Sequence, residues 1–305
     1  MNHSVIDLDI PELRLIARGK VRNIYDFEGN VLVVTTDRVS AFDRPLGIGV
    51  PGKAKVLTGL TAFWFGELSD LIGSYMISTD VPCSLGKYGG LLIGRTMLTK
   101  RVSFLPVEFV VRGYLYGSAW RDYCENGAVC GLMLKPGMRL GERLPEPIFT
   151  PALKVKSGHD VNITEDDCFS AIGAERGRRL KDMSIRIFRR AGCYLESRGI
   201  ILADTKMEFG ILGGQEVLVN EVLTPDCSRL WPGDRYAPGA QQASMDKQPL
   251  RDYLRAEGWT GEGPVTAVPD DVLLRMSEDY KEIHRIVTER KDGRDKAGIV
   301  AQSGC

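Results

Sequence analysis

The chain has no surplus of charge, because its 40 lysine and arginine residues balance 40 aspartate and glutamate residues. A neutral total gives no global attraction to nucleic acid or to an anionic membrane, so any basic site must be local. No apolar run approaches the roughly 20 residues needed to span a bilayer. The first residues lack a basic segment followed by an apolar one, so we expect no secretory signal.

Cysteine is scarce, and its spacing forms no recognisable pattern. The seven cysteines include no C-x-x-C pair, and their odd number fits neither a disulfide framework nor a zinc site. Free thiols are typical of a reducing compartment, so we expect a cytoplasmic protein. A hydrophobic content of 43% over 305 residues is typical of a globular protein with two domains or one large α/β unit.

Two nucleotide-binding motifs are also missing. No G-x-x-x-x-G-K-[ST] sequence is present, which excludes a P-loop. Residues 47–52 do read G-x-G-x-x-G, but Pro51 interrupts the turn and no βαβ repeat surrounds it, so we reject a Rossmann site. The surrounding Gly- and Pro-rich stretch, 37–55, is predicted to be a long loop, and such loops are often functional.

A charged hairpin is the most informative feature that is present. Residues 200–212 and 216–223 are predicted to form two antiparallel strands around a Gly-Gly turn. Alternate side chains of a strand share a face, so one surface carries a row of charges: Asp204, Lys206 and Glu208. This row suits a divalent cation and a phosphate, although a solvated face with cross-strand salt bridges would show the same pattern.

The register of this hairpin decides which residue of the return strand joins the charged face. A turn centred on the two glycines puts Glu221 opposite Lys206 and Asn220 opposite Met207. We therefore expect Glu221, and not Asn220, on the charged face. A slip of one residue would exchange the two.

Two segments nearer the N-terminus offer sites for anions. A predicted hairpin over 18–36 puts Lys20 and Arg22 on one face beside a glycine, which fits a phosphate clamp or an ordinary basic hairpin. A predicted strand over 107–115 is apolar except at two positions on one face, Glu108 and Arg112. Ser118 follows as a predicted helix N-cap, and a helix N-terminus binds anions readily. A capping serine and a surface arginine would explain the same residues.

The second half of the chain alternates connectors and helices. Residues 136–151 are predicted to be a connector, and the polar loop after it, with Lys154 and Asp160, is a candidate site because it is poor core material. A capping box at Thr164 predicts one long helix over 165–197. Residues 245–248 then lead a helix that runs to about 257, and a terminal helix is predicted over 270–291.

Taken in order, these segments resemble the SAICAR synthetase family, the ligases of de novo purine synthesis. The resemblance covers residues 18–254 and is carried by the series RGKVRNIYD, DRVSAFD, VPGKAKVL, LPVEFVVRGYLYGSAW, FTPALKVKSGHDVNIT, GIILADTKMEFG, NEVLTPDCSRLW and SMDKQPLRDYL. It implies an α+β fold similar to kinases and ATP-grasp proteins. An N-terminal antiparallel-sheet domain, 1–110, would lie over a larger α/β domain with C-terminal helices, 111–305, with ATP in the cleft.

The resemblance also implies a reaction and its substrates. ATP phosphorylates the carboxylate of 5-amino-1-(5-phosphoribosyl)imidazole-4-carboxylate, and the amine of L-aspartate displaces the phosphate to give the succinocarboxamide, ADP and phosphate. The chemistry needs cations at the γ-phosphate and Mg²⁺ held by carboxylates, but no covalent enzyme nucleophile. Small molecules would be the only partners, with no nucleic acid or membrane, and the protein would be a monomer or small homo-oligomer.

Matching motif to motif carries the family's site residues onto this chain. ATP would meet Lys20, Arg22 and Glu108. The imidazole substrate would meet Asp43, and its 5′-phosphate would meet Arg112, Ser118 and Arg229. Catalytic roles would fall to Lys154, Asp160, Asp204 and Lys206, with Lys206 between the γ-phosphate and the acceptor carboxylate. Glu208 and Glu221 would be magnesium ligands.

Three positions depart from the family pattern: Asn23, Val161 and Asn220, where Asp, Glu and Asp are common. Asn220 matters most, because it would weaken Mg²⁺ binding if the family's aspartate at that position is the metal ligand. It leaves open a catalytically inactive nucleotide-binding protein. A kinase-like or ATP-grasp ligase acting on another carboxylate is the second alternative.

Overall fold

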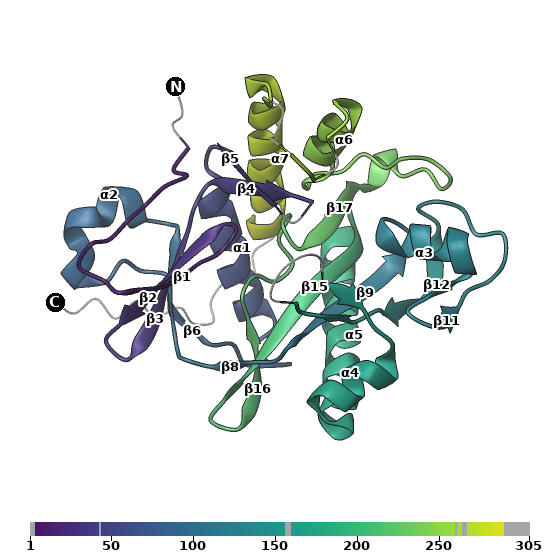
Figure 1. The fold of residues 1–305 in the computed structure, drawn as a ribbon, viewed down its shortest axis with the longest axis horizontal. Helices are drawn as coiled ribbons and strands as arrows, with labels where there is room; N and C mark the ends of the chain where they lie inside the picture. Colours follow the sequence, from purple (N-terminus) through teal and green to yellow (C-terminus); the bar gives the residue numbers. More distant parts are fainter. Residues whose placement is uncertain (1–3, 43, 156–159, 260, 264–266, 290–305) are drawn as a thin grey trace.

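Two antiparallel sheets organise the computed structural model, which describes residues 4–42, 44–155, 160–259, 261–263 and 267–289 (Figure 1). The first sheet has the strand order β1-β2-β3-β7-β6. Its strands are β1 (Leu15–Arg18), β2 (Arg22–Phe27), β3 (Asn30–Thr35), β6 (Met76–Ser78) and β7 (Thr96–Thr99). The turn between β2 and β3 is tight because Glu28 and Gly29 both adopt a positive φ, as a two-residue hairpin turn requires.

The second sheet has eight strands in the order β14-β13-β9-β15-β16, with β12 beside β9, and β8 and β17 beside β15. Its strands are β8 (Ser103–Phe104), β9 (Val107–Tyr114), β12 (Arg143–Phe149), β13 (Ala152–Leu153), β14 (Val161–Asn162), β15 (Ile200–Leu212), β16 (Gln215–Val219) and β17 (Ser228–Pro232). The long strand β15 therefore gathers segments that lie far apart in the sequence.

Two short ribbons and the helices complete the chain. The ribbons are β4 (Arg38–Ala41) with β5 (Arg44–Gly49), and β10 (Ala128–Val129) with β11 (Leu132–Met133). The α-helices are α1 (Lys53–Glu67), α2 (Gly89–Leu92), α3 (Ser118–Asn126), α4 (Glu165–Ile172), α5 (Ala174–Glu196), α6 (Gln248–Ala256) and α7 (Asp270–Thr288). None of the helices in the described part of the chain combines the length and hydrophobicity needed to cross a bilayer.

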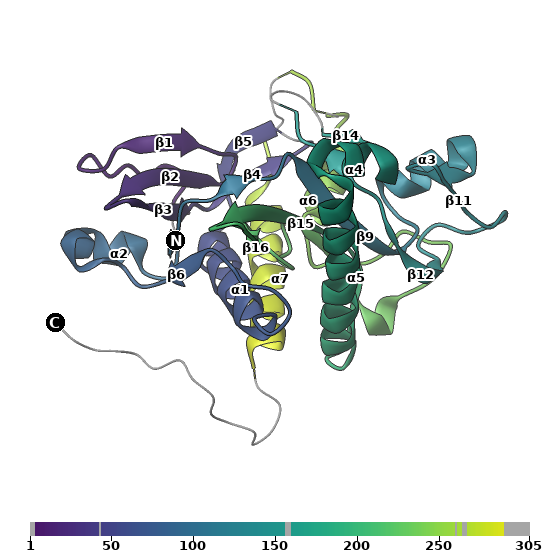
Figure 2. The ribbon, with the colours of Figure 1, turned by 90° about the horizontal axis from the view of Figure 1, so that it is seen from below.

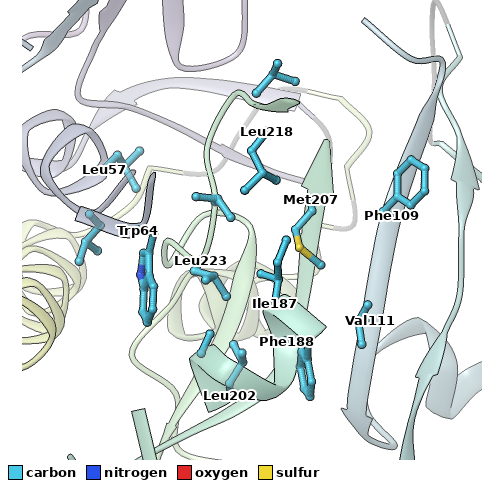
Figure 3. Close-up of a cluster of buried hydrophobic side chains, with 14 of the residues drawn as sticks. Leu57, Trp64, Phe109, Val111, Ile187, Phe188, Leu202, Met207, Leu218 and Leu223 are labelled. Atoms are coloured by element: carbon cyan, nitrogen blue, oxygen red, sulfur yellow. The ribbon is translucent and has the colours of Figure 1, made fainter. Parts of the chain in front are cut away.

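The helix α5 covers one face of the large sheet, and α1 packs beside α7 next to it (Figure 2). Alternation along β9 decides which side chains meet α5. Phe109 and Val111 join Ile187 and Phe188 of α5 in the main hydrophobic core (Figure 3). The residues that alternate with them, Glu108, Val110 and Arg112, line a cavity on the opposite face. The sheet thus has a buried apolar face and a charged face, and the site lies on the charged one.

The α+β fold is the one predicted, and several predicted elements are confirmed. These are the N-terminal hairpin, the strand now seen as β9, the Gly-Gly hairpin, the capping box of α4 and the terminal helix. The division into 1–110 and 111–305 stays a prediction, and β9 runs across position 110.

Other predicted elements are wrong. The loop at 37–55 contains the β4–β5 ribbon and the start of α1, and the connector at 136–151 contains β12. The single helix over 165–197 is two helices, because Gly173 between them has a φ of 91°, which no continuous helix allows. Ser118 is not the N-cap of α3 but its first residue, and Gly117 is the cap.

Candidate active site

A row of three charged residues crosses three neighbouring strands. Asp204 of β15 lies directly between Arg112 of β9 and Arg229 of β17 in the strand register. Its Oδ2 accepts from Arg112 Nη1 at 2.9 Å and also from Arg229. All three side chains are largely buried. Because carboxylate and guanidinium groups form strong charge-assisted hydrogen bonds, the row is firmly positioned.

The two arginines differ in how fully their nitrogen atoms are hydrogen-bonded. Arg112 donates to Thr150 Oγ1 at 2.9 Å and to Ser118 Oγ at 3.1 Å. Within the described residues, the buried Nε of Arg229 has no hydrogen-bond partner. A Cβ at Gly117, whose φ is 63°, would come within 2.4 Å of Arg229, so only glycine fits here. A helix N-terminus with Ser118 and two guanidinium groups is a site for a phosphate or carboxylate.

Two residues further along β15, Lys206 extends over the same face. Its Nζ donates to Glu108 Oε1 at 2.6 Å. Burial raises the pKa of Glu108, while the Lys206 ammonium partly offsets that effect. Burial opposes the charged form of Lys206, but the Glu108 carboxylate outweighs it and raises the pKa of this lysine. Lys206 is therefore a cation at neutral pH, placed where a polyanion could meet it.

The end of the charged face is built by Glu208, Lys154 and Asn220. Glu208 accepts a hydrogen bond from Asn220 Nδ2 at 2.7 Å and pairs with Lys154. Burial lowers the pKa of Lys154, and the Glu108 carboxylate opposes this shift. Asp160, at the start of the segment after the undescribed 156–159, accepts from the Val155 amide at 3.1 Å.

The expected register of the hairpin is confirmed as far as Val219, which pairs with Glu208. Beyond it the expectation is wrong, because Asn220 has a φ of 57° and the chain leaves the ladder. Glu221 does not pair across the ladder with Lys206. Its carboxylate instead accepts from Arg22 of β2 at 3.0 Å, which joins the two sheets. Both residues lie at the charged face, because Asn220 contacts Glu208 and Glu221 lines the same cavity as Lys206.

Arg38 of β4 holds the glycine-containing turn that precedes β2. Arg38 donates to the carbonyl oxygens of Gly19 at 3.1 Å and Lys20 at 3.2 Å, and to Asn23 Oδ1 at 2.8 Å. Asn23 is fully buried and its amide donates to Leu8 O at 2.6 Å. Asn23, which departs from the family pattern, therefore helps to hold the turn that contains Lys20. It lies away from the charged face.

One cavity of about 380 Å³, here called the cleft, collects most of the predicted site residues. Those lining it are Lys20, Glu108, Arg112, Ser118, Asp204, Lys206, Glu221 and Arg229. Arg22, Lys154 and Glu208 lie outside its lining but pair with residues of the charged face. Asp43 lies outside the described residues.

Further residues of the cleft had no predicted role. Asp226, Lys247 and Arg251 line it, and the first two belong to a buried ionic cluster. For Lys247 and Arg251 the signal in the sequence was the segment SMDKQPLRDYL, in which a lysine and an arginine stand four residues apart at the start of a helix, whereas Asp226 lies in the segment NEVLTPDCSRLW.

The oxygen donors near Glu208 fit Mg²⁺ bound with a nucleotide. Among the described residues no group of three or more His, Cys, Asp or Glu side chains could hold a metal alone. Glu208 and Glu221 supply one carboxylate each, and Asn220 adds an amide oxygen. Mg²⁺ commonly uses one or two carboxylates together with substrate phosphates and water, so a complete protein cage is not needed.

The chain is similar to known proteins over most of its length. The family model of SAICAR synthetase matches residues 15–265. The chain is 45% identical to the phosphoribosylaminoimidazole-succinocarboxamide synthase of Desulforapulum autotrophicum over 295 residues, which are 95% of this chain and 100% of that protein. Against the enzyme of the same name from Geobacter sulfurreducens, identity is 45% over 92% of this chain and 97% of the other.

Solved structures give the same result. The SAICAR synthase of Saccharomyces cerevisiae, in complex with SAICAR, superposes with a TM-score of 0.85 at 37% identity, covering 93% of this chain and 98% of that chain. A type-2 SAICAR synthetase in complex with ADP shares the fold, with a TM-score of 0.67 at 23% identity, over 92% of this chain and 100% of the other.

Proposed function

The chain belongs to the SAICAR synthetase family, and from that premise we propose how its cleft carries out the reaction. It is an ATP-dependent ligase of purine biosynthesis that acts on small-molecule substrates. It joins L-aspartate to 5-amino-1-(5-phosphoribosyl)imidazole-4-carboxylate through an acyl phosphate and releases SAICAR, ADP and phosphate.

The observation that carries the assignment of roles is the shared cleft. Residues expected for ATP, for the ribotide and for catalysis come from distant parts of the chain, yet eight of them line one cavity. A ligase that transfers a phosphoryl group between two substrates needs both of them bound side by side. A protein that only binds a nucleotide would not need Arg112, Ser118 and Arg229, the residues expected to bind the ribotide 5′-phosphate.

The ribotide 5′-phosphate would be held at the Asp204 end of β15. Arg112, Ser118 and Arg229 supply the donors, and the unpartnered Nε of Arg229 favours an anion there. Asp204 holds both guanidinium groups and so orients them toward the phosphate. A fixed phosphate would place the imidazole ring further along the strand, where Asp43 is expected to contact it.

Phosphoryl transfer would take place around Lys206. A carboxylate is a poor acyl donor because its oxygen does not leave, and an acyl phosphate removes that difficulty. Lys206 would neutralise charge between the γ-phosphate and the acceptor carboxylate, while Lys20 and Arg22 hold the ATP phosphates and the segment of Glu108 meets adenine. Lys154 and Asp160 would act at the imidazole carboxylate.

Magnesium would be held by Glu208 and Glu221. When bound with ATP, the ion would reduce the negative charge of the phosphate groups. The protein would supply two carboxylates from different segments: Glu208 on β15, and Glu221 beside Arg22.

The test is an assay of the purified protein with ATP, Mg²⁺, the ribotide carboxylate and L-aspartate. We expect ADP and the succinocarboxamide to appear together, and only when all components are present. ADP formation with the ribotide but without a need for aspartate would favour a ligase or kinase acting on another acceptor. Nucleotide binding without any ADP formation would favour the inactive nucleotide-binding protein.

Three further expectations belong to this proposal. We expect a monomer or small homo-oligomer that needs no nucleic acid or membrane for activity. A cytoplasmic location stays a prediction from the cysteine pattern. Size-exclusion chromatography with light scattering on the active protein tests the first of these.

A further inference from the structure

A cavity separate from the cleft, here called the α5 pocket, lies between α5 and β12, which are side by side (Figure 2). Its volume is about 340 Å³. Small-molecule sites commonly have volumes of about 300–1,000 Å³. The pocket shares no lining residue with the cleft, so the reaction proposed above makes no use of it.

The pocket exists because β12 leaves its ladder. Arg143 of β12 lies opposite Tyr114 of β9. The next pair is Ile148 opposite Arg112, so residues 144–147 face a single residue of β9. This segment reads LPEP, and proline cannot donate a ladder hydrogen bond. The resulting bulge carries the strand away from β9, and all of 144–147 line the pocket.

The helix α5 leaves room on the other side of the pocket. Gly192 of α5 lines it, and a Cβ added to this glycine would have no atom within 4 Å. Apolar side chains form part of the wall: Phe188 of α5, Leu144 of the bulge and Leu202 of β15. The bulge and the glycine therefore leave an open space with an apolar wall.

Tyr114 is the clearest sign that a ligand belongs in this space. The residue is only 8% exposed, and its ring packs edge-on against Trp231 and Tyr236. Within the described residues its hydroxyl has no hydrogen-bond partner. A buried tyrosine hydroxyl normally has one. Because Tyr114 lines the pocket, a ligand bound there can supply the missing partner.

Two charged residues of the pocket also lack partners. Arg143 and Glu196 are exposed residues that line it, and in the described part of the chain neither side chain forms an ion pair or a hydrogen bond. Burial raises the pKa of Tyr114, while the Arg143 charge lowers it and the Glu196 charge raises it, so both lie near the hydroxyl. By contrast, Arg189 and Glu146 line the pocket but pair with each other at 2.6 Å.

A cation and an anion that share a pocket without pairing match a zwitterion. An α-amino acid carries a carboxylate that can accept from a guanidinium and from a hydroxyl, and an ammonium that can donate to a carboxylate. Its side chain can lie against the apolar wall. A simple anion or a simple amine would leave one of the two charges unpaired.

We propose that the α5 pocket binds an α-amino acid with an apolar side chain. Arg143 and Tyr114 hold its carboxylate, Glu196 holds its ammonium, and the apolar wall receives its side chain. The inference goes beyond the proposed function and does not depend on it, because the pocket and the cleft are lined by different residues.

The first experiment uses L-phenylalanine as the probe and Cys193 as the reporter. Cys193 and Cys124 are both exposed free thiols, but of the two Cys193 alone lines the pocket. Alkylation by iodoacetamide is followed by peptide mass spectrometry. At a concentration ten times the dissociation constant, L-phenylalanine should slow alkylation of Cys193 about tenfold and leave Cys124 unchanged. Calorimetric titration should give the same constant, about 1 mM or below. Neither heat nor protection would overturn the inference.

The second experiment tests the recognition of a zwitterion. Phenylpropanoate lacks the ammonium group and phenethylamine lacks the carboxylate, so each should bind about tenfold more weakly than L-phenylalanine. Equal binding of either analogue would assign the pocket to a simple anion or a simple amine and would refute the amino-acid assignment. An increase in the KM for L-aspartate on adding L-phenylalanine would place the probe in the cleft, with the same consequence.

The third experiment locates the site with substitutions. Arg143→Gln and Glu196→Gln should each weaken binding of L-phenylalanine about tenfold, whereas Arg186→Gln, on α5 but outside the lining of the pocket, should leave it unchanged. Gly192→Leu should abolish binding by filling the pocket. Its unfolding temperature should not fall, because leucine favours a helix more than glycine does. Unchanged binding in a folded Gly192→Leu variant would show that the probe binds elsewhere.

Discussion

The two ends of the charged face of β15 are built in different ways. At one end Asp204 lies in register between two arginines on adjacent strands, and its contacts are buried. At the other end Glu208 meets Lys154 and Asn220, which come from a loop and from the point where the chain leaves the ladder. One end is held by the sheet register and the other from outside the ladder, so we expect the first end to be rigid and the second to be adjustable.

This difference matches what each end has to do. A phosphate that is not transformed needs a fixed anchor, and a sheet register provides one. Metal ligands that meet ATP must adapt to a nucleotide that arrives and leaves. The same strand therefore combines a rigid binding site with an adjustable one, and Lys206 lies between them.

The largest expected effect on stability is at the rigid end. Asp204→Asn should lower the free energy of unfolding by about 3–5 kcal/mol, because two buried guanidinium groups lose their carboxylate. Glu208→Gln should cost less than about 1 kcal/mol, because Lys154 can return to water. Urea unfolding of both variants measures the difference. Equal losses would mean that the two ends are equally rigid.

Between the two ends, Lys206→Ala should affect catalysis rather than folding. Its side chain is 35% exposed, so little packing is lost. We expect kcat to fall about 10²- to 10³-fold, as when a preorganised donor is removed from a developing charge. Steady-state kinetics and a urea titration of the same preparation test both parts, and a kcat near that of wild type would refute the role.

At the adjustable end, the metal ligand can be assigned by two substitutions. Glu221→Gln should raise the Mg²⁺ concentration at half-maximal rate several-fold, about 1 kcal/mol for weakening a charged ligand, and more than Asn220→Ala does. A Mg²⁺ titration at fixed ATP gives both values. The reverse order would make Asn220 the ligand and Glu221 a partner of Arg22 alone.

The smallest effect concerns pH. Burial lowers the pKa of Lys154, so a rate that needs its ammonium form should be lost as pH rises through a value below the ordinary lysine pKa of about 10.4. In Lys154→Arg the guanidinium stays charged up to about pH 12, so the alkaline limb of kcat/KM should move to higher pH. An unmoved limb would assign it to another group.

The fold class and much of the site could be predicted because both depend on local pattern. Alternation put Asp204, Lys206 and Glu208 on one face, and the Gly-Gly turn set the register down to Val219. The β4–β5 ribbon was missed because glycine and proline in this segment favour loops. In the structure the two strands nevertheless pair with each other. Lys247 and Arg251 of SMDKQPLRDYL line the cleft but were given no role from the sequence, because two cations on a helix are usually a solvated face.

By itself, the sequence determined which residues share a face, where the hairpin turns and which family the ordered motifs resemble, since these follow from spacing along the chain. Only the tertiary structure decided that Asp204 lies between Arg112 and Arg229, 92 and 25 residues away. It also decided that Asn220 ends the ladder and that Tyr280 reaches Asp226. The physical reason is that spacing orients a side chain, whereas its partners depend on which distant segments pack beside it.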